Sequence, residues 1–377
     1  MNNISNIALR GKRVLVRVDF NVPLSEHYNI IDDSRIVATL PTIKKIIAEG
    51  GKVIIMSHLG RPKNGFEEKF SLKHTVQHLS NLLAQNVSFS SDCIGENTIS
   101  DIDKMNNGDV LVLENLRFYS EEKKGNIGFA NQLANLADVY VNDAFGTAHR
   151  AHASTAIIAQ FFPNNKYFGY LLSSEIEYLE KVLNNPERPF TAIIGGAKIT
   201  GKIDVITSLL DKVDNLIIGG GMAYTFAKAM GGEIGKSLVE DEKVSLAKQL
   251  IEDAKKKGVA LLLPTDSVNA DNFSNNANTN TSNILEINSD YMGLDIGKKS
   301  IIKFSDTIKN SKTIIWNGPM GVFEMEKFEK GTKEIGEAIC FATNKGAFSL
   351  VGGGDSVAAV KKFGFANRVS YISTGGG

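Results

Sequence analysis

The sequence has 377 residues, of which 42% are hydrophobic and 22% are charged, with 42 Lys and Arg residues against 42 Asp and Glu residues. This is the composition of a globular protein, and it excludes a disordered or fibrous chain. At roughly 100–200 residues per domain, the length suggests two or three domains. Because the formal net charge is zero, we expect no nucleic-acid or anionic-membrane partner, since no overall positive field would attract phosphate polymers.

The cysteines and the N-terminus indicate the compartment. Cys93 and Cys340 lie far apart and form no CxxC pair, so we expect neither a disulfide framework nor a thiolate metal site. This cysteine usage fits a reducing cytoplasm. The segment Met1–Arg10 lacks the apolar core of a signal peptide, and no run approaches the ~18 apolar residues of a membrane helix. The sequence therefore predicts a cytoplasmic protein without a membrane segment.

Short apolar runs rich in Val and Ile alternate with longer segments of helical periodicity along most of the chain. The predicted strands are Arg13–Val18, Lys52–Ser57, Asp109–Glu114, Asp138–Asn142, Thr191–Ile194, Asn215–Ile218, Ala260–Pro264, Thr313–Trp316 and Phe348–Val351. The predicted helices, with a period near 3.6, include Arg35–Glu49, Ile203–Asp211, Val244–Lys257 and Gly331–Thr343. Alternating strands and helices indicate parallel, doubly wound sheets. Nine or more strands exceed one comfortable sheet, so we expect two α/β domains.

A domain boundary is predicted near the middle of the chain. The amphipathic segment Ser173–Leu183 precedes two closely spaced prolines, Pro186 and Pro189, which end a helix and stiffen a connector. We predict an N-terminal domain at 1–169, a connecting helix and hinge at 170–189, and a C-terminal domain at 190–377. The predicted fold is thus two Rossmann-like domains joined by a hinge helix. The Asn-, Thr- and Ser-rich stretch Asn272–Asn283 is expected to be a surface loop.

Arginine, histidine and glycine are distributed unevenly between the two halves. Seven of the nine arginines precede residue 151 and all six histidines precede residue 153, whereas 24 of the 35 glycines follow residue 169. Arginine forks bind carboxylate and phosphate groups, and clustered glycines let backbone amides approach phosphates. This asymmetry favours a small anionic ligand on the first half and a nucleotide on the second. Surface arginines without a function would give the same counts.

Polar side chains follow most of the strands predicted in the first half. Ligands of open parallel sheets bind beyond the carboxyl ends of the strands. The candidate anion-binding residues there, including one at a helix start, are Arg35, His58, Arg61, Arg117 and Arg150. A surface ion pair would explain any one arginine, but several strand-end loops with the same chemistry favour an anion site. A metal site at His149 and His152 is disfavoured because no cysteine or acidic ligands accompany them.

A glycine-rich loop, Gly195–Lys202, follows a predicted strand and opens a helix in the second half. From Gly196 it matches GxxxxGK, the start of a P-loop, but Ile203 stands where that loop needs Ser or Thr for magnesium. We therefore do not expect a true P-loop. Lys198 and Lys202 still lie at a helix start suited to an anion, although a tight turn before a solvated helix is the alternative.

Three further glycine-rich segments follow strands, namely Gly219–Gly221, Asn317–Glu324 and Gly352–Ser356. Amides at the last of these could hold a phosphate while Asp355 holds magnesium. Glu324 could accept hydrogen bonds from ribose hydroxyls. One triple glycine is weak support, but three such sites together with the lysine loop favour a nucleotide.

In this order, the motifs resemble those of the phosphoglycerate kinase family, and the likeness runs from Val14 to Gly377. The matching segments are Arg13–Pro23, Ser57–Pro62, Leu113–Phe118, Val141–Ser154, Gly195–Lys202, Trp316–Glu324 and Gly352–Asp355. The resemblance implies reversible phosphoryl transfer from 1,3-bisphosphoglycerate to MgADP, giving 3-phosphoglycerate and MgATP, in glycolysis and gluconeogenesis. It further implies a monomer that works by domain closure and electrostatic stabilisation, without a covalent intermediate.

The resemblance also implies residue roles. The implied triose-binding residues are Asp19, Asn21, Arg35, His58, Arg61, Arg117 and Arg150. The implied nucleotide-binding residues are Gly195, Lys198, Lys202, Gly219, Gly293, Asn317, Glu324, Gly353, Gly354, Asp355 and Ser356. Asp355 is the implied ligand of Mg²⁺, the expected cofactor bound with ADP or ATP. Arg35 and Lys202 are implied to stabilise the transferring phosphoryl group.

An acyl phosphate is already activated, so this reaction needs no nucleophile–base pair, and positioning and charge stabilisation suffice. The rival interpretations are a P-loop NTPase or other small-molecule kinase, and a non-catalytic nucleotide-binding scaffold on the same fold. The family's chain continues beyond Thr374-Gly-Gly-Gly and returns to the first domain, whereas this sequence stops at Gly377. Either the sequence is shortened or docking between the domains is impaired.

Overall fold

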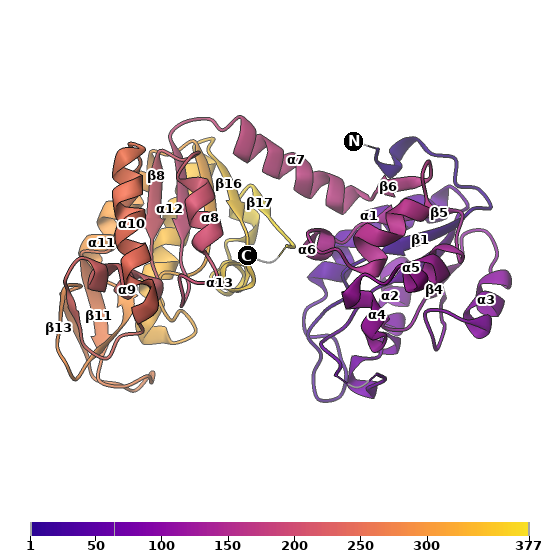
Figure 1. Cartoon of the computed structure of the whole chain (residues 1–377), viewed down its shortest axis with the longest axis horizontal. Coiled ribbons are helices and arrows are strands. Elements are labelled where there is room, and N and C mark those ends of the chain that lie inside the picture. The colour runs from indigo at the N-terminus through magenta and orange to yellow at the C-terminus, as the bar shows by residue number, and fades with distance from the viewer. Residues whose placement is uncertain (1, 64, 376–377) are drawn as a thin grey trace. The chain divides into compact units, whose positions relative to one another are not determined.

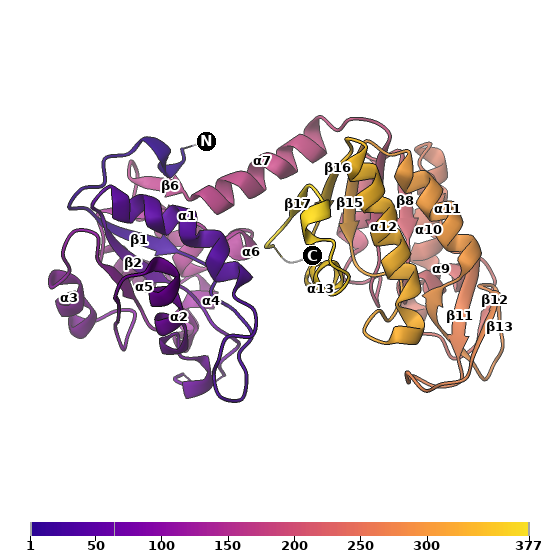
Figure 2. The same ribbon diagram turned by 180° about the vertical axis from the view of Figure 1, so that it is seen from behind.

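The computed structural model describes residues 2–63 and 65–375, and the chain forms two compact units, Met1–Glu177 (unit 1) and Tyr178–Gly377 (unit 2) (Figures 1 and 2). Each unit contains a six-stranded sheet whose neighbouring strands all run parallel, with helices on both faces. The predicted fold class of two doubly wound parallel α/β sheets is confirmed. Among the described residues, no helix is both long and apolar enough to span a membrane.

The sheet of unit 1 has the strand order β3-β4-β2-β1-β5-β6. Its strands are β1 (Arg13–Arg17), β2 (Lys52–Met56), β3 (Val87–Phe89), β4 (Val110–Val112), β5 (Val139–Asn142) and β6 (Lys166–Phe168). Its helices are α1 (Ser34–Ala48), α2 (Lys73–Leu83), α3 (Glu96–Asp103), α4 (Ser120–Lys124), α5 (Ile127–Ala134) and α6 (Phe145–Ala148). Val14 and Val16 of β1 pack into one buried cluster and Leu15 into another. Because a strand alternates its side chains, this central strand is apolar on both faces.

The sheet of unit 2 has the order β10-β8-β7-β15-β16-β17. Its strands are β7 (Phe190–Ile194), β8 (Asn215–Ile218), β10 (Ala260–Leu262), β15 (Thr313–Asn317), β16 (Phe348–Val351) and β17 (Tyr371–Ile372). Its helices are α8 (Ile203–Leu209), α9 (Met222–Ala229), α10 (Val244–Lys256), α11 (Lys298–Lys309), α12 (Lys330–Asn344) and α13 (Gly354–Lys362). Ala192 and Ile194 of β7 face one core cluster and Ile193 faces the other, so this sheet is also covered on both sides.

Shorter elements complete the two units. A three-stranded antiparallel sheet in the order β12-β11-β14 consists of β11 (Asp266–Ala270), β12 (Thr279–Asn283) and β14 (Met292–Ile296). A two-stranded sheet pairs β9 (Glu233–Ile234) with β13 (Glu286–Ile287). Single 3-10 or π turns lie at Ile4–Asn6, Glu68–Phe70, Leu116–Phe118, Ala153–Ile157, Ile158–Phe161, Asp241–Lys243, Glu326–Phe328 and Ala366–Arg368.

The Asn-rich segment corrects one expectation. Asn272–Asn283 was expected to be a surface loop throughout, but its end forms strand β12, which pairs antiparallel with β11. The segment is polar because β12 is an edge strand and most of its side chains face solvent, and such a strand is held by backbone hydrogen bonds rather than by burial. The edge strands β3, β6 and β17 are also absent from the predicted strands, because each is short and only partly buried and no continuous apolar run marks it.

Helix α7 (Tyr170–Asn184) carries the chain from unit 1 into unit 2. Its first turn is fixed to unit 1: the Tyr170 amide donates to Thr42 Oγ1 at 2.9 Å and the Leu172 amide to Asp143 Oδ1 at 3.0 Å. The compact units divide inside this helix, after Glu177. Its role as a hinge stays a prediction. The expected return of the terminal segment to the first domain lies outside the described residues.

Candidate functional site

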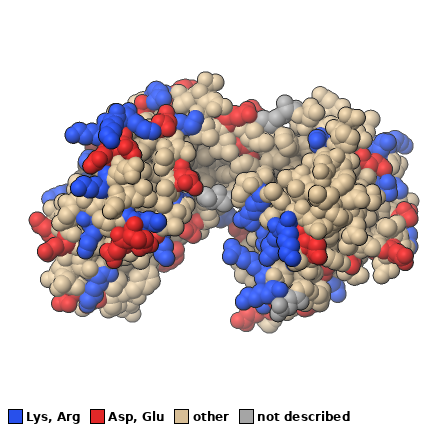
Figure 3. Space-filling view, in the orientation of Figure 1, with Lys and Arg blue, Asp and Glu red and all other residues tan. Residues whose placement is uncertain are grey.

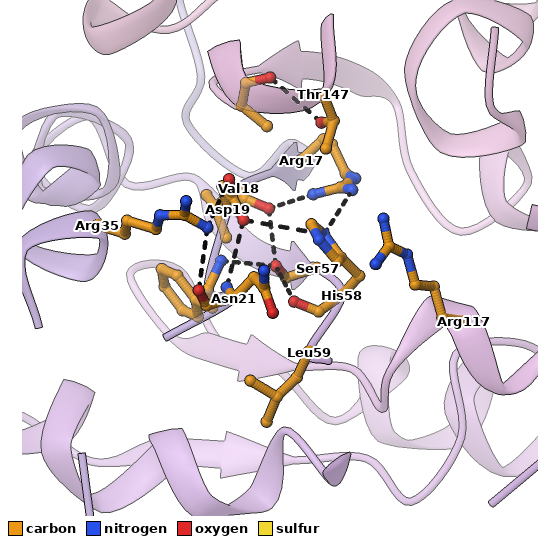
Figure 4. A network of polar contacts seen from close by, with 12 residues as sticks. Arg17, Val18, Asp19, Asn21, Arg35, Ser57, His58, Leu59, Arg117 and Thr147 are labelled. Atoms are coloured by element: carbon orange, nitrogen blue, oxygen red, sulfur yellow. Dashed lines mark hydrogen bonds and ion pairs between the residues drawn. The ribbon is translucent and has the colours of Figure 1, made fainter. Parts of the chain in front are cut away.

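The carboxyl ends of β1 and β2 in unit 1 bring polar side chains together. The two strands pair in register, with Arg17 opposite Met56, so the residues that follow them, Asp19 and His58, emerge at the same edge of the sheet. Asp19, Asn21, Arg35, His58 and Arg117 converge there with the buried Arg17 (Figure 4). We call these six residues the basic cluster.

Hydrogen bonds hold the rim of the basic cluster in place. Asp19 Oδ2 lies 3.2 Å from Arg35 Nη1, and the same nitrogen donates to the Asn21 carbonyl at 3.0 Å. The Gly60 amide donates to Asn21 Oδ1 at 2.8 Å, while Arg117 Nη1 donates to the Gly60 carbonyl at 2.8 Å. The arginines are therefore positioned by neighbouring loops before any ligand binds.

The basic cluster concentrates cations where little water reaches them. His58 is 3% exposed, and burial, followed by the charges of Arg17, Arg117, Arg35 and Arg150, holds its pKa well below the ordinary value. Burial and the neighbouring Arg17 and Arg150 lower the pKa of Arg117 to about 10. A bound anion would relieve this repulsion, because it supplies the countercharge that the desolvated guanidinium groups lack.

Two predicted residues lie at the margin of the basic cluster. Arg150 is exposed, follows α6 and donates from Nε to His149 Nε2 at 3.2 Å; its charge still acts on His58. Arg61 is exposed and adjoins Gly60 in the chain. In the space-filling view, Lys and Arg side chains gather along one edge of unit 1 (Figure 3). Within the described residues, neither arginine forms an ion pair with a carboxylate.

Sequence reasoning missed the buried residues whose hydrogen bonds support the basic cluster. Arg17 is fully buried, and its Nε donates to Ser154 Oγ at 2.9 Å. Ser154 in turn donates to the buried carboxylate of Glu122. An arginine inside a predicted core strand is a sequence signal that could have drawn attention to Arg17. Ser154 and Glu122 carry no such signal.

Unit 2 contains a cavity of about 490 Å³ at the ends of its central strands. Its apolar walls include Leu238, Met292, Leu294, Pro319 and Val322, and its polar lining includes Lys236, Glu324 and Asp355. Backbone of Gly196, Gly220, Gly221, Gly293 and Gly321 forms much of the remaining surface. Ligand pockets commonly combine such apolar walls with a few polar groups that orient the ligand.

The predicted glycines have different positions around this cavity. Gly293 lines it, and a Cβ there would collide with the Tyr224 ring. Gly195 and Gly219 do not line it: a Cβ on Gly195 would meet the carbonyls of Gly318 and Pro319, and one on Gly219 would meet Met320. These two glycines therefore permit the close crossing of strand-end loops that shapes the cavity.

The remaining predicted residues of unit 2 lie around the N-terminus of α13. Half-buried Lys202 donates from Nζ to Asn317 Oδ1; burial lowers the pKa of Lys202, and the Asp355 charge opposes that effect. Buried Ser356 accepts a hydrogen bond from the Gly318 amide at 2.5 Å. Gly353 has a positive φ of 89°, which favours glycine, and Gly354 has open space around its α-carbon.

The lysine loop before α8 is fastened by a residue that sequence reasoning missed. Glu240 accepts hydrogen bonds from the Ile199 amide at 2.5 Å and from Thr200 Oγ1 at 2.6 Å. Lys198 is exposed on the same loop. The Glu240 carboxylate thus holds the turn that places Lys202, although it follows that turn by some forty residues in the chain.

The carboxylates of unit 2 could hold Mg²⁺ only together with phosphate oxygens of a bound ligand. The described residues contain no group of three or more His, Cys, Asp or Glu side chains that could hold a metal ion. Asp355 presents one exposed carboxylate in the first turn of α13. Magnesium in nucleotide sites commonly takes one or two carboxylates, with phosphate oxygens and waters as the other ligands. A lone Asp355 meets that requirement.

The fold and the sites define a two-unit α/β protein with a cluster of cationic side chains on one unit and a glycine-lined cavity on the other. The phosphoglycerate kinase family model matches residues 4–377. The phosphoglycerate kinase of Porphyromonas gingivalis is 53% identical, with 99% of this chain and 95% of the relative covered. That of Thermosynechococcus vestitus is 54% identical, covering 99% and 93%.

Solved structures agree with these relatives. The phosphoglycerate kinase structure from Coxiella burnetii superposes with a TM-score of 0.88 at 42% identity, covering 100% of this chain and 94% of that one. The phosphoglycerate kinase structure from Pyrococcus horikoshii gives 0.85 at 31% identity, with the same coverage. The chain therefore belongs to the phosphoglycerate kinase family and is a phosphotransferase. Both rivals, the P-loop NTPase and the non-catalytic scaffold, are thereby disfavoured.

Proposed function

We propose that the protein transfers a phosphoryl group reversibly from 1,3-bisphosphoglycerate to MgADP, giving 3-phosphoglycerate and MgATP. One observation carries the proposal: on unit 1 the half-buried Arg117 forms no ion pair with a carboxylate within the described residues, and unit 2 combines a glycine-lined cavity with the half-buried Lys202. The first suits a small ligand with several negative charges, and the second suits a nucleotide. The proposed setting is glycolysis and gluconeogenesis, in the cytoplasm, as a monomer.

On unit 1, the proposed triose-binding residues are Asp19, Asn21, Arg35, His58, Arg61, Arg117 and Arg150. The guanidinium groups bind carboxylate and phosphate oxygens as forks. Asp19 and Asn21 fix the orientation of Arg35 through the contacts described above. Arg35 keeps part of its side chain exposed, so its guanidinium group remains accessible to the transferring phosphoryl group.

On unit 2, the apolar walls hold the base and Glu324 accepts hydrogen bonds from the ribose. Amides at Gly353 and Gly354 and the side chains of Lys198 and Lys202 bind the phosphates. Asp355 would hold Mg²⁺, which neutralises charge on the phosphate oxygens when it is bound. The proposed roles of Asn317 and Ser356 are to orient Lys202 and the loop at Gly318.

The chemistry needs positioning and charge stabilisation rather than a base. An acyl phosphate is activated, and in the reverse direction the attacking group is a carboxylate without a proton to lose. Lys202 and Arg35 stabilise negative charge on the equatorial oxygens of the transferring group. Because the proposed sites lie on different units, transfer requires the two ligands to come within roughly 3–3.5 Å, and closure would also exclude water from the acyl phosphate.

The direct test is a coupled assay that follows ATP formation from MgADP and 1,3-bisphosphoglycerate generated in place. We expect ATP only when both substrates and Mg²⁺ are present. A protein that binds nucleotide but forms no ATP under these conditions would support the non-catalytic scaffold instead.

A further inference from the structure

A series of buried hydrogen bonds links Glu122 of α4, through Ser154 and Arg17, to His58 of the basic cluster. Ser154 donates to Glu122 twice, from its amide to Oε2 at 3.0 Å and from its hydroxyl to Oε1 at 2.6 Å. The Ser154 oxygen accepts from Arg17 Nε at 2.9 Å. Arg17 Nη2 lies 3.2 Å from His58 Nδ1 (Figure 4). Glu122, Ser154 and Arg17 are all fully buried.

The direction of these hydrogen bonds follows from the chemistry of the groups that form them. Because the Ser154 hydroxyl donates its hydrogen bond to the Glu122 carboxylate, its lone pairs are free to accept a hydrogen bond from Arg17. Arginine has only donors and stays protonated in proteins. Nδ1 of His58 must therefore accept from Arg17, and an accepting ring nitrogen carries no proton.

The charges that face His58 also favour a neutral ring. Arg17 of β1, Arg35 of α1, Arg117 of the Leu116–Phe118 turn and Arg150 after α6 all act against a positive charge on it. Asp19 acts in the other direction, but its Oδ1 lies 3.9 Å from His58 Nδ1, which is too long for a hydrogen bond. Further along the chain, His152 Nδ1 lies 3.8 Å from Glu122 Oε1 and makes no hydrogen bond.

We propose that Arg17, anchored by Ser154 and Glu122, is a positioning residue that keeps His58 neutral with its proton on Nε2. With Nδ1 occupied by Arg17, and with no hydrogen bond to Nε2 found within the described residues, the Nε2 proton is available to an oxygen of an anionic ligand. Arg17 thus acts through His58. A doubly protonated His58 ring would have no acceptor at Nδ1 and would repel Arg17. The tautomer with its proton on Nδ1 would direct the lone pair of Nε2 at the anion.

The consequence for binding rests on the proposed function, in which 3-phosphoglycerate binds at this site, but the state of the ring is a property of the unliganded protein. The two can be measured separately. Nitrogen-15 NMR of the full chain distinguishes protonated from unprotonated ring nitrogens, and a His58→Gln variant assigns the signals. We expect a neutral His58 with the proton on Nε2, at pH 7 and still at pH 5.5, below the ordinary histidine pKa of about 6.5.

The chain of hydrogen bonds is tested at Ser154. Ser154→Ala removes the acceptor of Arg17 Nε and leaves that group buried without a partner, so we expect Arg17 to shift. His58 should then show a mixture of tautomers, and the Kd for 3-phosphoglycerate should rise about tenfold, the usual effect of losing one such hydrogen bond. Ser154→Thr retains the hydroxyl and should restore both measurements.

A matched control is Ser90→Ala, which removes another fully buried serine hydroxyl of unit 1, bonded to Thr98 Oγ1 at 3.3 Å. It should leave the His58 signals and the Kd unchanged. A doubly protonated ring or a proton on Nδ1 at pH 7 in the unsubstituted protein would overturn the inference. It would also fail if Ser154→Ala behaved like Ser90→Ala. If the unsubstituted protein binds no 3-phosphoglycerate, the proposed function fails while the NMR result still decides the state of His58.

Discussion

The cations of the two sites differ in how firmly they are held. Arg17, Arg35 and Arg117 each donate to a backbone carbonyl, so the fold fixes where their charges lie. Lys202 is half-buried and bonded to Asn317, whereas Lys198 is exposed. A fixed donor costs no reorganisation at the moment of reaction, so the held residues are the ones whose loss should affect turnover most.

Lys202→Ala should therefore lower kcat much more than it raises either KM. The lost donor is aimed at charge that develops in the transition state, and removing one such donor costs roughly 3 kcal/mol, about a hundredfold in rate. Steady-state kinetics of ATP formation will measure this. Lys248→Ala, at an exposed position of α10, is the control and should change neither constant. A Lys202→Ala enzyme with near-normal kcat would remove Lys202 from this role.

Asp355→Asn should weaken binding of the magnesium nucleotide and leave 3-phosphoglycerate binding nearly unchanged. Asp355 lies exposed in the first turn of α13, and magnesium binds a carboxylate far better than an amide. Calorimetric titration of each ligand will test this. An equal loss for both ligands would show that Asp355 supports the fold instead of the metal.

At the level of elements, the sites form where strands end and helices begin. In unit 2 the loops after β7, β8 and β15 cross one another: the Gly195 amide donates to Asn317, the Gly196 amide to Pro319, and the Gly220 amide to Met320. This crossing leaves no room for side chains, which explains the glycines at Gly195 and Gly219. The cavity is therefore a joint product of three loops.

A buried acid fastens the start of α12 behind this cavity. Asp295 of β14 is 1% exposed and accepts hydrogen bonds from the Gly331 amide at 2.7 Å and the Ile296 amide at 2.9 Å. Burial raises the pKa of Asp295 to about 8, against the effect of these two hydrogen bonds. The folded protein therefore holds a proton on Asp295 at pH values where the unfolded chain, with an ordinary pKa near ~3.9, does not.

This difference predicts how stability depends on pH. Between about pH 4 and pH 8 the folded state binds one more proton than the unfolded state, so the contribution of Asp295 to the free energy of unfolding falls as pH rises. The slope is at most about 1.4 kcal/mol per pH unit, and it vanishes above the folded pKa of about 8.

Asp295→Asn should remove this slope, although losing one acceptor lowers stability by about 1–3 kcal/mol at low pH. Urea unfolding at several pH values will show it. The control is Asp306→Asn at an exposed position of α11, which should keep the pH dependence of the unsubstituted protein. An unchanged slope in Asp295→Asn would mean that Asp295 is ionised in the folded state.

At the level of the whole molecule, the proposed reaction divides its ligands between two compact units. Each unit buries its own core on both faces of its sheet. Helix α7 connects the two and is fixed at its first turn to unit 1. Phosphoryl transfer needs reacting atoms in contact, so we infer that ligands on both units favour a closed state through contacts that neither makes alone.

Small-angle scattering of the complete chain should therefore give a smaller radius of gyration with MgADP and 3-phosphoglycerate together than with either ligand alone. Asp355→Asn is the matched control: with its nucleotide site impaired, it should not become more compact at the same ligand concentrations. The four states to compare are the protein without ligand, with each ligand alone, and with both. An equal radius of gyration in all four, for an enzyme shown to be active, would contradict closure.

The sequence by itself determined the parallel α/β class and many candidate residues. Central strands such as β1 and β7 are apolar on both faces, which only a sheet covered on both sides requires, so their local pattern was sufficient. Asp19, His58 and Arg117 were identifiable because they follow predicted strands, and the carboxyl ends of parallel strands share one edge of the sheet. Glycine-rich loops before helices marked the second site in the same way.

Only the tertiary structure decided what supports those residues. Arg17 reaches Ser154 across 137 residues of sequence, and Glu240 reaches Ile199 across 41; nothing local marks either pair. The tertiary structure also shows that Gly293 lines the cavity, whereas Gly195 and Gly219 allow loops to cross. The physical reason is that strand and helix periodicity is set by near neighbours along the chain, whereas burial, pKa and hydrogen-bond partners depend on which distant segments pack together.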